Sequence, residues 1–188
     1  MASSFSDLGL ELMVTGENAG TWGDKTNTNL ELVQQAIAGY QSVTVSGTGT
    51  TTLSMTDGTI SNARNAVIKL AGTITGNINV TIPNSIEKTY IVENTTSGAH
   101  TVTFKTVSGS GFTFGTTEKN HAILYSDGTN VVEVINITSG LQGISNAAVT
   151  DGNFVVGNGT TLVAENGATA RTSLGAGTTD DVQFDSFG

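Results

Sequence analysis

Apolar and polar residues alternate along most of the middle of the chain. Residues 40–46, 77–83 and 100–106 carry apolar side chains at every second position. A period of two is typical of strands that bury one face. Residues 50–55, 65–72, 88–95, 121–126 and 130–136 are further candidate strands, and turns rich in Gly, Asn, Asp and Ser separate them. The pattern predicts a mainly β protein, with an antiparallel β-sandwich or small barrel over residues 40–137.

One segment before these strands has the periodicity of a helix. Leu30, Val33 and Ile37 recur at the spacing of one helix face. Asn27 or Thr28 is the candidate N-cap of this short helix. A helix of about ten residues is not stable alone in water. We therefore expect it to pack against the β domain or against another chain, as part of an N-terminal segment over residues 1–39.

The last part of the chain, residues 138–188, has isolated apolar residues and frequent glycine. It predicts two short strands at 154–156 and 162–163, then one or two helical turns within 166–174. Such a segment has too few apolar residues for a core of its own, but copies can bury them around a symmetry axis. We expect the start of an extended, intertwined fibre shaft, whose core residues are Phe154, Val156, Leu162, Leu174 and Phe184. The last residues begin a new strand pair, which suggests that the native chain continues past Gly188.

Composition and charge narrow the range of partners. The formal net charge is −9, with 7 basic and 16 acidic residues, so no basic stripe is available for nucleic acid or anionic lipid. The chain has no cysteine, which excludes disulfides and thiolate metal sites. No stretch approaches the roughly 18 apolar residues of a membrane span, and the N-terminus lacks a signal peptide. We expect a protein made in the cytoplasm that does not insert into membranes.

Candidate catalytic groups are sparse. His100 and His121 both fall at expected strand starts, and Ser110 lies between glycines without the spacing of a nucleophile elbow. The acidic pairs Asp180–Asp181 and Glu17/Asp24 do not match a calcium loop. The glycine-rich turns lack the Lys-Ser/Thr ending of a phosphate loop. We therefore expect no enzymatic activity, no cofactor and no metal.

Trp22, the only tryptophan, lies just before the expected helix. Its ring either packs in the core against Leu30 or Val33, or belongs to a docking element, since tryptophan is enriched at interface hot spots. We name Trp22, Leu30, Val33 and Ile37 as candidate docking or trimer-interface residues.

The segment "TGENAGTWGDKTNTNLELVQQAIAGY" (15–40) resembles the opening of tail fibres and related virion proteins of marine and cyanobacterial tailed phages. "ILYSDGTNVVEV" (123–134) is similar to the hairpin that closes the associated β domain. "FVVGNGTTLVAENGATARTSLG" (154–175) is similar to a phage fibre shaft segment. Residues 41–120 match only in composition.

This resemblance implies a structural virion protein, the N-terminal part of a homotrimeric tail fibre. Its partners would be its own copies, a tail adaptor or nozzle-type protein, and a host surface receptor reached through a distal part. A head or baseplate fibre has the same build. A carbohydrate-binding β-sandwich with exposed aromatic residues is the alternative from another class. A polysaccharide depolymerase would need a paired acid on a long repetitive β-helix, for which this chain is too short.

Overall fold

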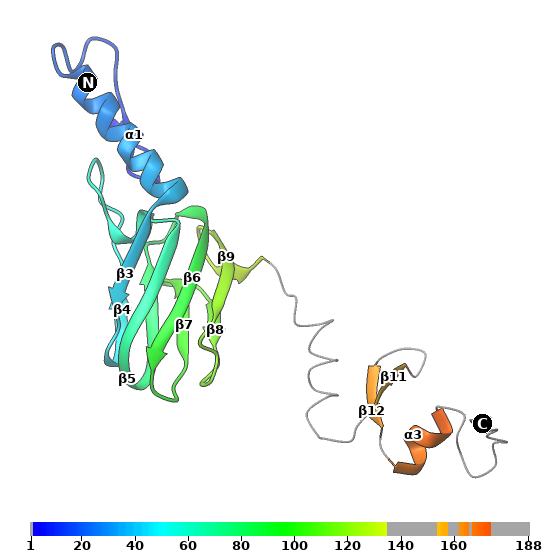
Figure 1. Ribbon diagram of the computed structural model, residues 1–188. Helices are drawn as coiled ribbons and strands as arrows, with labels where there is room; N and C mark the ends of the chain where they lie inside the picture. The colour runs from blue at the N-terminus through cyan, green and yellow to red at the C-terminus, as the bar shows by residue number, and fades with distance from the viewer. Residues whose placement is uncertain (1, 135–153, 158–161, 166, 174–188) are drawn as a thin grey trace, which may run out of the picture. The chain divides into compact units, whose positions relative to one another are not determined.

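The computed structural model describes residues 2–134, 154–157, 162–165 and 167–173 (Figure 1). The chain divides into two compact units, Met1–Ile135 and Asn136–Gly188, and each is described by itself. Within the described residues, no helix has the length and apolar content needed to cross a membrane.

The first unit begins with two short strands and one long helix. Strands β1 (Ser4–Phe5) and β2 (Glu11–Leu12) pair antiparallel, and α1 spans Trp22–Ala38. The helix is longer than expected and begins at Trp22, so the predicted start at Asn27 or Thr28 is wrong. Thr21 occupies the N-cap without a side-chain hydrogen bond, and Asp24 lies in the first turn. An acidic side chain there is favourable next to the positive end of the helix dipole, which helps this early start.

Nine further elements follow in the first unit, and they confirm the mainly β prediction. The strands are β3 (Tyr40–Thr44), β4 (Gly47–Thr52), β5 (Val67–Ile82), β6 (Glu87–Ser97), β7 (Val102–Thr106), β8 (Gly111–Phe114), β9 (His121–Asp127) and β10 (Val131–Glu133), with a 3-10 turn at Asn62–Arg64. The order β10-β9-β6-β5-β7-β8 forms one sheet, and β3 and β4 pair with β5. The candidate strands 65–72 and 77–83 are one continuous strand, β5, and β8 was not predicted.

Strand direction differs from the antiparallel expectation for every pair that includes β5. β5 runs parallel to β3, β4, β6 and β7, whereas β6–β9, β7–β8 and β9–β10 are antiparallel. Parallel strands need a return connection between them. Here a strand serves as the return connection. The first half of β5 pairs with β3 and β6, and its second half pairs with β4 and β7. The connections therefore stay short although the strands are parallel.

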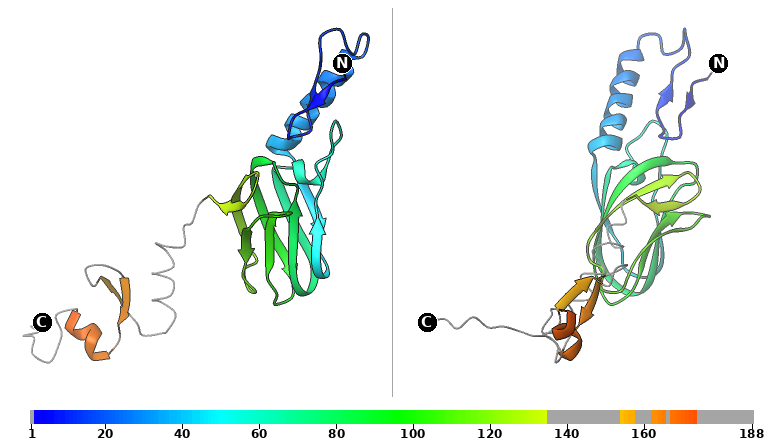
Figure 2. Two further views of the ribbon diagram at one scale, coloured as in Figure 1. Left: turned by 180° about the vertical axis from the view of Figure 1, so that it is seen from behind. Right: turned by 90° about the vertical axis from the view of Figure 1, so that its right-hand side faces the viewer.

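The strands form two layers, which the side view shows (Figure 2, right). We call β3, the first half of β5, β6, β9 and β10 the front layer, and β4, the second half of β5, β7 and β8 the back layer. The chain turns from one layer to the other at Gly72 and Gly98, whose φ angles are +126° and +103°. A Cβ at Gly98 would lie 2.2 Å from the carbonyl oxygen of Ile74, so stacked backbones meet closely at this corner. The backbone N–H of Val131 donates to the oxygen of Ser110 at 3.0 Å, which brings β10 to the start of β8 and nearly closes the barrel.

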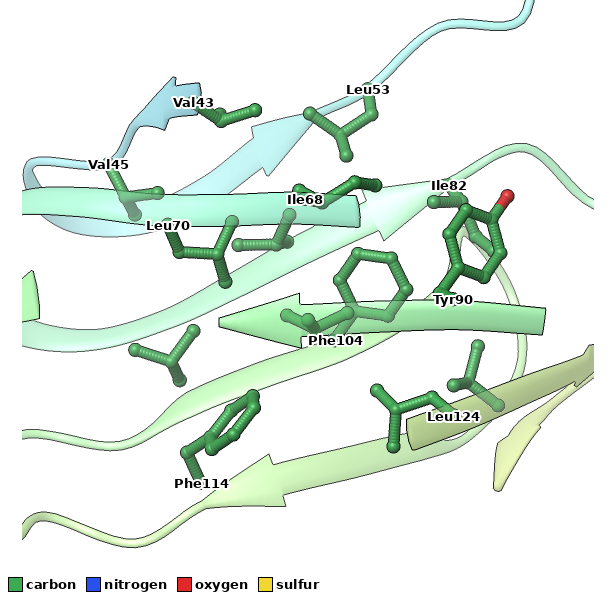
Figure 3. Close-up of a cluster of buried hydrophobic side chains, with 14 of the residues drawn as sticks. Val43, Val45, Leu53, Ile68, Leu70, Ile82, Tyr90, Phe104, Phe114 and Leu124 are labelled. Atoms are coloured by element: carbon green, nitrogen blue, oxygen red, sulfur yellow. The ribbon is translucent and has the colours of Figure 1, made fainter. Parts of the chain in front are cut away.

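The core lies between the layers (Figure 3). Alternate residues of each strand point inward, including Ile68 and Leu70 of β5 and Leu124 of β9, all of which are fully buried. Tyr90 and Phe104 meet edge to face with ring centroids 5.4 Å apart. The period-two pattern therefore predicted correctly the inward-facing apolar residues of 40–46, 77–83 and 100–106, which are buried.

The second unit contains β11 (Phe154–Gly157), β12 (Leu162–Glu165) and α3 (Gly167–Ser173). β11 and β12 pair antiparallel, with Val156 opposite Val163. These elements confirm the two short strands and the helical turns that the sequence predicts there.

Candidate functional site

Helix α1 exposes an apolar stripe. Trp22, Leu30 and Ile37 are 66%, 61% and 74% exposed, and Val33 beside them is half-buried. At about 100° per residue these positions fall within about 80° of one another around the helix. We call Trp22, Leu30 and Ile37 the helix stripe. Trp22 therefore does not pack in the core, and the helix stripe is exposed in the part of the chain that the structure describes.

The side of the helix next to the helix stripe is held by the N-terminal segment. Asn29 accepts a hydrogen bond from the backbone N–H of Glu11 and donates to its carbonyl oxygen, both at 2.9 Å. Lys25 forms an ion pair with the Glu11 carboxylate at 2.9 Å, and this contact lowers the pKa of Glu11. Leu32, on the same side, is 1% exposed. The packed face of the helix is thus centred on Leu32 and not on the predicted residues.

Arg64 fixes the helix to the top of the β domain. Its side chain is fully buried, and Nε donates to the carbonyl oxygen of Leu8 at 2.8 Å. Nη1 donates to Oε1 of Gln35 on α1 at 3.2 Å, and Nη2 donates to the oxygen of Thr56 at 2.6 Å. One guanidinium therefore joins the N-terminal segment, the helix and the loop after β4. Such a junction gives the helix stripe a defined position relative to the sheet.

The outer face of the front layer carries an apolar row. Tyr40 pairs with Val67, Val67 with Ile91, and Ile91 with Ile123 across four neighbouring strands. Val134 continues the line, because its backbone N–H donates to the oxygen of Ile123 at 2.9 Å. We call these five residues the sheet row. Tyr40, Ile91, Ile123 and Val134 are each exposed, so this side of the sheet is not covered within the first unit.

Two further apolar residues widen the sheet row. Tyr125 on β9 pairs with Val132 on β10, and both are exposed. The helix stripe and the sheet row also meet, because Ile37 and Ile91 line the same pocket. Together they form one apolar surface that runs from α1 across the front layer. Extended apolar surfaces of this kind mark sites of protein association.

A charged row borders the sheet row on one side. Lys69, Glu93 and His121 lie next to one another in the strand register. Lys69 Nζ lies 3.5 Å from Oε1 of Glu93, and Nε2 of His121 lies 3.8 Å from the same oxygen. Beyond this row the outer face carries small residues such as Ala71 and Thr95. The apolar surface is therefore confined to the half of the front layer nearest α1.

The candidate catalytic groups are dispersed. His100 lies in the turn between β6 and β7, and His121 begins β9. Ser110 donates to Oδ1 of Asn130 in a turn, and Glu17 accepts a hydrogen bond from Ser3. Among the described residues, no cluster of three His, Cys, Asp or Glu side chains is arranged to hold a metal ion. Asp180 and Asp181 lie outside the described residues.

The predicted shaft residues belong to the second unit. Phe154 and Val156 lie on β11, and Leu162 lies on β12. Leu174 and Phe184 fall outside the described residues.

Sequence analysis did not identify the sheet row, although a signal was present. β6 and β9 carry apolar residues on both faces: Tyr90 and Val92 point inward while Ile91 points outward, and Ile123 and Tyr125 flank the buried Leu124. Apolar residues at both the inward-facing and the outward-facing positions of a strand are typical of strands that are covered on both sides. Arg64 gave no such signal, because a lone arginine in a polar loop is normally exposed.

No protein-family model, curated protein or solved structure matches this chain.

Proposed function

We propose that this chain is the N-terminal part of a homotrimeric tail fibre of a bacteriophage, a structural protein that anchors the fibre to the virion and carries a distal host-recognition part. Its role is assembly and adhesion, without catalytic turnover. The observation that carries the proposal is the continuous apolar surface formed by the helix stripe and the sheet row. A protein that functions as a separate monomer gains nothing from exposing it.

The two parts of this surface suit different partners. The sheet row ends at Val134, and the chain then continues into residues 135–188, which contain the predicted shaft. Packing three copies through the sheet row would bring the beginnings of three shaft segments together. The helix stripe, which includes Trp22, would then contact the adaptor or nozzle-type protein of the tail.

The sequence supports the same proposal independently. The Thr-Gly-Glu and Gly-Thr-Trp-Gly motifs that resemble phage fibre openings fall at Thr15–Glu17 and Gly20–Gly23, directly before and at the start of α1. The resemblance and the exposed stripe thus concern the same element. The predicted docking residues and the exposed apolar residues of the helix largely coincide.

The location of the protein in the particle tests this proposal. Antibodies raised against the full chain would be applied to intact phage particles and followed by immunogold electron microscopy. We expect label at the tail, where the fibre attaches. Label at the head or baseplate would place the protein in another fibre of the same build, and absence from particles that package all their other proteins would contradict a virion role.

A further inference from the structure

Strand β3 forms one lateral edge of the front layer, and among the described residues its only strand partner is β5 (Figure 1). The N–H of Val45 donates to the oxygen of Ala71 on β5 at 2.8 Å. Because alternate residues of a parallel strand bond to the same neighbour, Ser42 turns its N–H and its C=O to the open side. In the single chain Nε2 of Gln41 donates to the oxygen of Ser42 at 2.7 Å, where the N–H of a neighbouring strand would lie.

The edge of β3 lacks the features that normally keep exposed edge strands from pairing with other chains. Such edges carry charged side chains, proline or a bulge. Residues 40–56 contain no Asp, Glu, Lys, Arg or Pro. On β4, the open edge of the back layer, the register shifts between Gly47 and Gly49, whereas β3 pairs with β5 in one continuous register. The edge of β3 is therefore suited to the addition of a strand.

The opposite edge of the front layer is β10, and the strand pattern of the sequence continues beyond it. Ile135 and Ile137 alternate with Asn136 and Thr138, as in a strand with one apolar face. Four strand spacings, about 19 Å along the sheet, separate β10 from β3 of the same copy. The three residues from Val134 to Ile137 span at most about 11 Å. These residues therefore cannot pair with β3 of their own copy.

Threefold symmetry would bring the two edges of neighbouring copies together. The sheet row begins with Tyr40 at the β3 edge and ends with Val134 at the β10 edge. Rotation about an axis parallel to the strands keeps height, so Val134 of one copy would come level with Tyr40 of the next. Five strands about 4.8 Å apart make each side of the triangle about 24 Å long and leave each sheet about 7 Å from the axis. One layer of side chains fits there, because packed sheets lie about 10 Å apart.

We propose that residues 135–138 of one copy pair, as a parallel strand, with β3 of the next copy. Because this pairing joins two copies, it rests on the proposed homotrimer. The C=O of Ile135 would accept the N–H of Ser42, and the N–H of Ile137 would replace Gln41 as the donor to the oxygen of Ser42. Ile135 and Ile137 would then face the core beside Val43, which is 8% exposed.

The polar residues of the segment fit the same register. Ser42 pairs with Lys69 at the end of the charged row, so Asn136 of the neighbouring copy would extend that row. Thr138 would follow at the level of the small residues beyond it. The alternation of residues 135–138 thus matches the alternation of the front layer, with apolar side chains toward the core.

The chain has no cysteine, so an engineered disulfide reports this contact without background. Ser42 and Asn136 would lie opposite each other on one face, at a Cα separation that a disulfide can span. Oxidised Ser42→Cys/Asn136→Cys should give covalent trimers on a non-reducing gel. We expect at least tenfold more of them than from Thr50→Cys/Asn136→Cys, the matched control at the open edge of β4.

Light scattering of the unoxidised double variant separates this pairing from the proposed function. A trimer mass without covalent trimers after oxidation would overturn the strand pairing and leave the homotrimer in place. A disulfide formed within one chain would also overturn it. A monomer mass would contradict both.

Hydrogen exchange of the unmodified full chain, followed by nuclear magnetic resonance, tests the pairing without cysteines. The N–H of Leu53 donates to the oxygen of Thr81 at 2.7 Å, so the N–H of Thr50 points away from β5, as that of Ser42 does. We expect the amide of Ser42 to be protected at least tenfold more than that of Thr50. Equal protection of the two amides would overturn the proposal.

Discussion

Two buried cations, Arg64 and Lys88, organise the end of the β domain that carries α1. Arg64 satisfies backbone oxygens of the N-terminal segment and of the loop after β4, and Lys88 lies between two carbonyl groups beside Tyr90. Neither has a carboxylate within ion-pair distance among the described residues. Hydrogen bonds to neutral groups stabilise both positive charges. We expect Arg64 to matter mainly for the stability of the first unit, and Lys88 to matter for the dependence of stability on pH.

Replacement of Arg64 by methionine should destabilise the first unit. The substitution leaves the carbonyl oxygens of Leu8 and Thr56 without their donor inside the protein, and we expect a loss of about 3 kcal/mol in the free energy of unfolding. Urea denaturation followed by circular dichroism measures it. Arg171→Met, which changes an exposed arginine on α3, is the matched control and should cost less than about 0.5 kcal/mol. Similar losses in both variants would contradict the role of Arg64 as a junction.

Lys88 should make stability depend on pH in the alkaline range. Its pKa in the folded protein is about 8, below the usual value of 10.5, so between these values the unfolded chain binds more protons. The free energy of unfolding should then rise by roughly 1–2 kcal/mol from pH 8 to pH 9.5. Above pH 10 the buried Tyr90, whose pKa is raised by burial, acts in the opposite direction and limits the useful range.

Denaturation at several pH values tests this expectation. Lys88→Met should lack the rise, and Lys69→Met should retain it because Lys69 lies on the outer face. An unchanged slope in Lys88→Met would mean that other groups cause the pH dependence.

At the scale of elements, α1 shows how far a periodic pattern can predict packing. The apolar spacing of Leu30, Val33 and Ile37 correctly indicates one apolar helix face, but that face points to solvent in the single chain. The packed face contains Leu32 and is otherwise polar, since Lys25, Asn29 and Gln35 bind the N-terminal segment and the Arg64 junction. Hydrophobic periodicity cannot distinguish a face buried within the chain from one reserved for a partner.

Paired substitutions on α1 test this assignment of faces. Leu32→Ala should cost about 2–4 kcal/mol in the free energy of unfolding, because it leaves a cavity. Leu30→Ala should change it by less than about 0.5 kcal/mol, because that side chain is exposed. Thermal and urea denaturation of the two variants measure the difference. A larger loss in the free energy of unfolding for Leu30→Ala than for Leu32→Ala would mean that Leu30, and not Leu32, lies on the packed face.

The β domain shows a second limit of sequence analysis. Strand positions and inward-facing residues follow from local alternation, so most strands were predicted within a few residues. Strand direction depends on which distant segments pair, and the parallel pairing of β5 with four neighbours leaves no mark in the alternation. The candidate strands 65–72 and 77–83 form one strand in the structure, because Gly72 serves as a corner within β5.

At the scale of the whole molecule, the apolar surface is the feature that stays exposed in a single copy of the first unit. The helix stripe, the pocket and the sheet row lie together on the first unit, and the sheet row ends where the chain continues toward the second. Assembly through the sheet row would cover Ile91 and Ile123 and leave the charged row of Lys69, Glu93 and His121 to set the register between copies. We therefore predict that the protein is an oligomer before it meets any partner.

The mass of the full chain in solution, measured by light scattering over a range of concentrations, tests this claim most directly. We expect three times the chain mass of 19.2 kDa. Ile91→Glu should raise the concentration at which the trimer dissociates at least tenfold, because a carboxylate would replace an apolar contact in the interface, whereas Thr44→Glu on the same outer face should not. A chain that stays at 19.2 kDa at all concentrations would contradict the account.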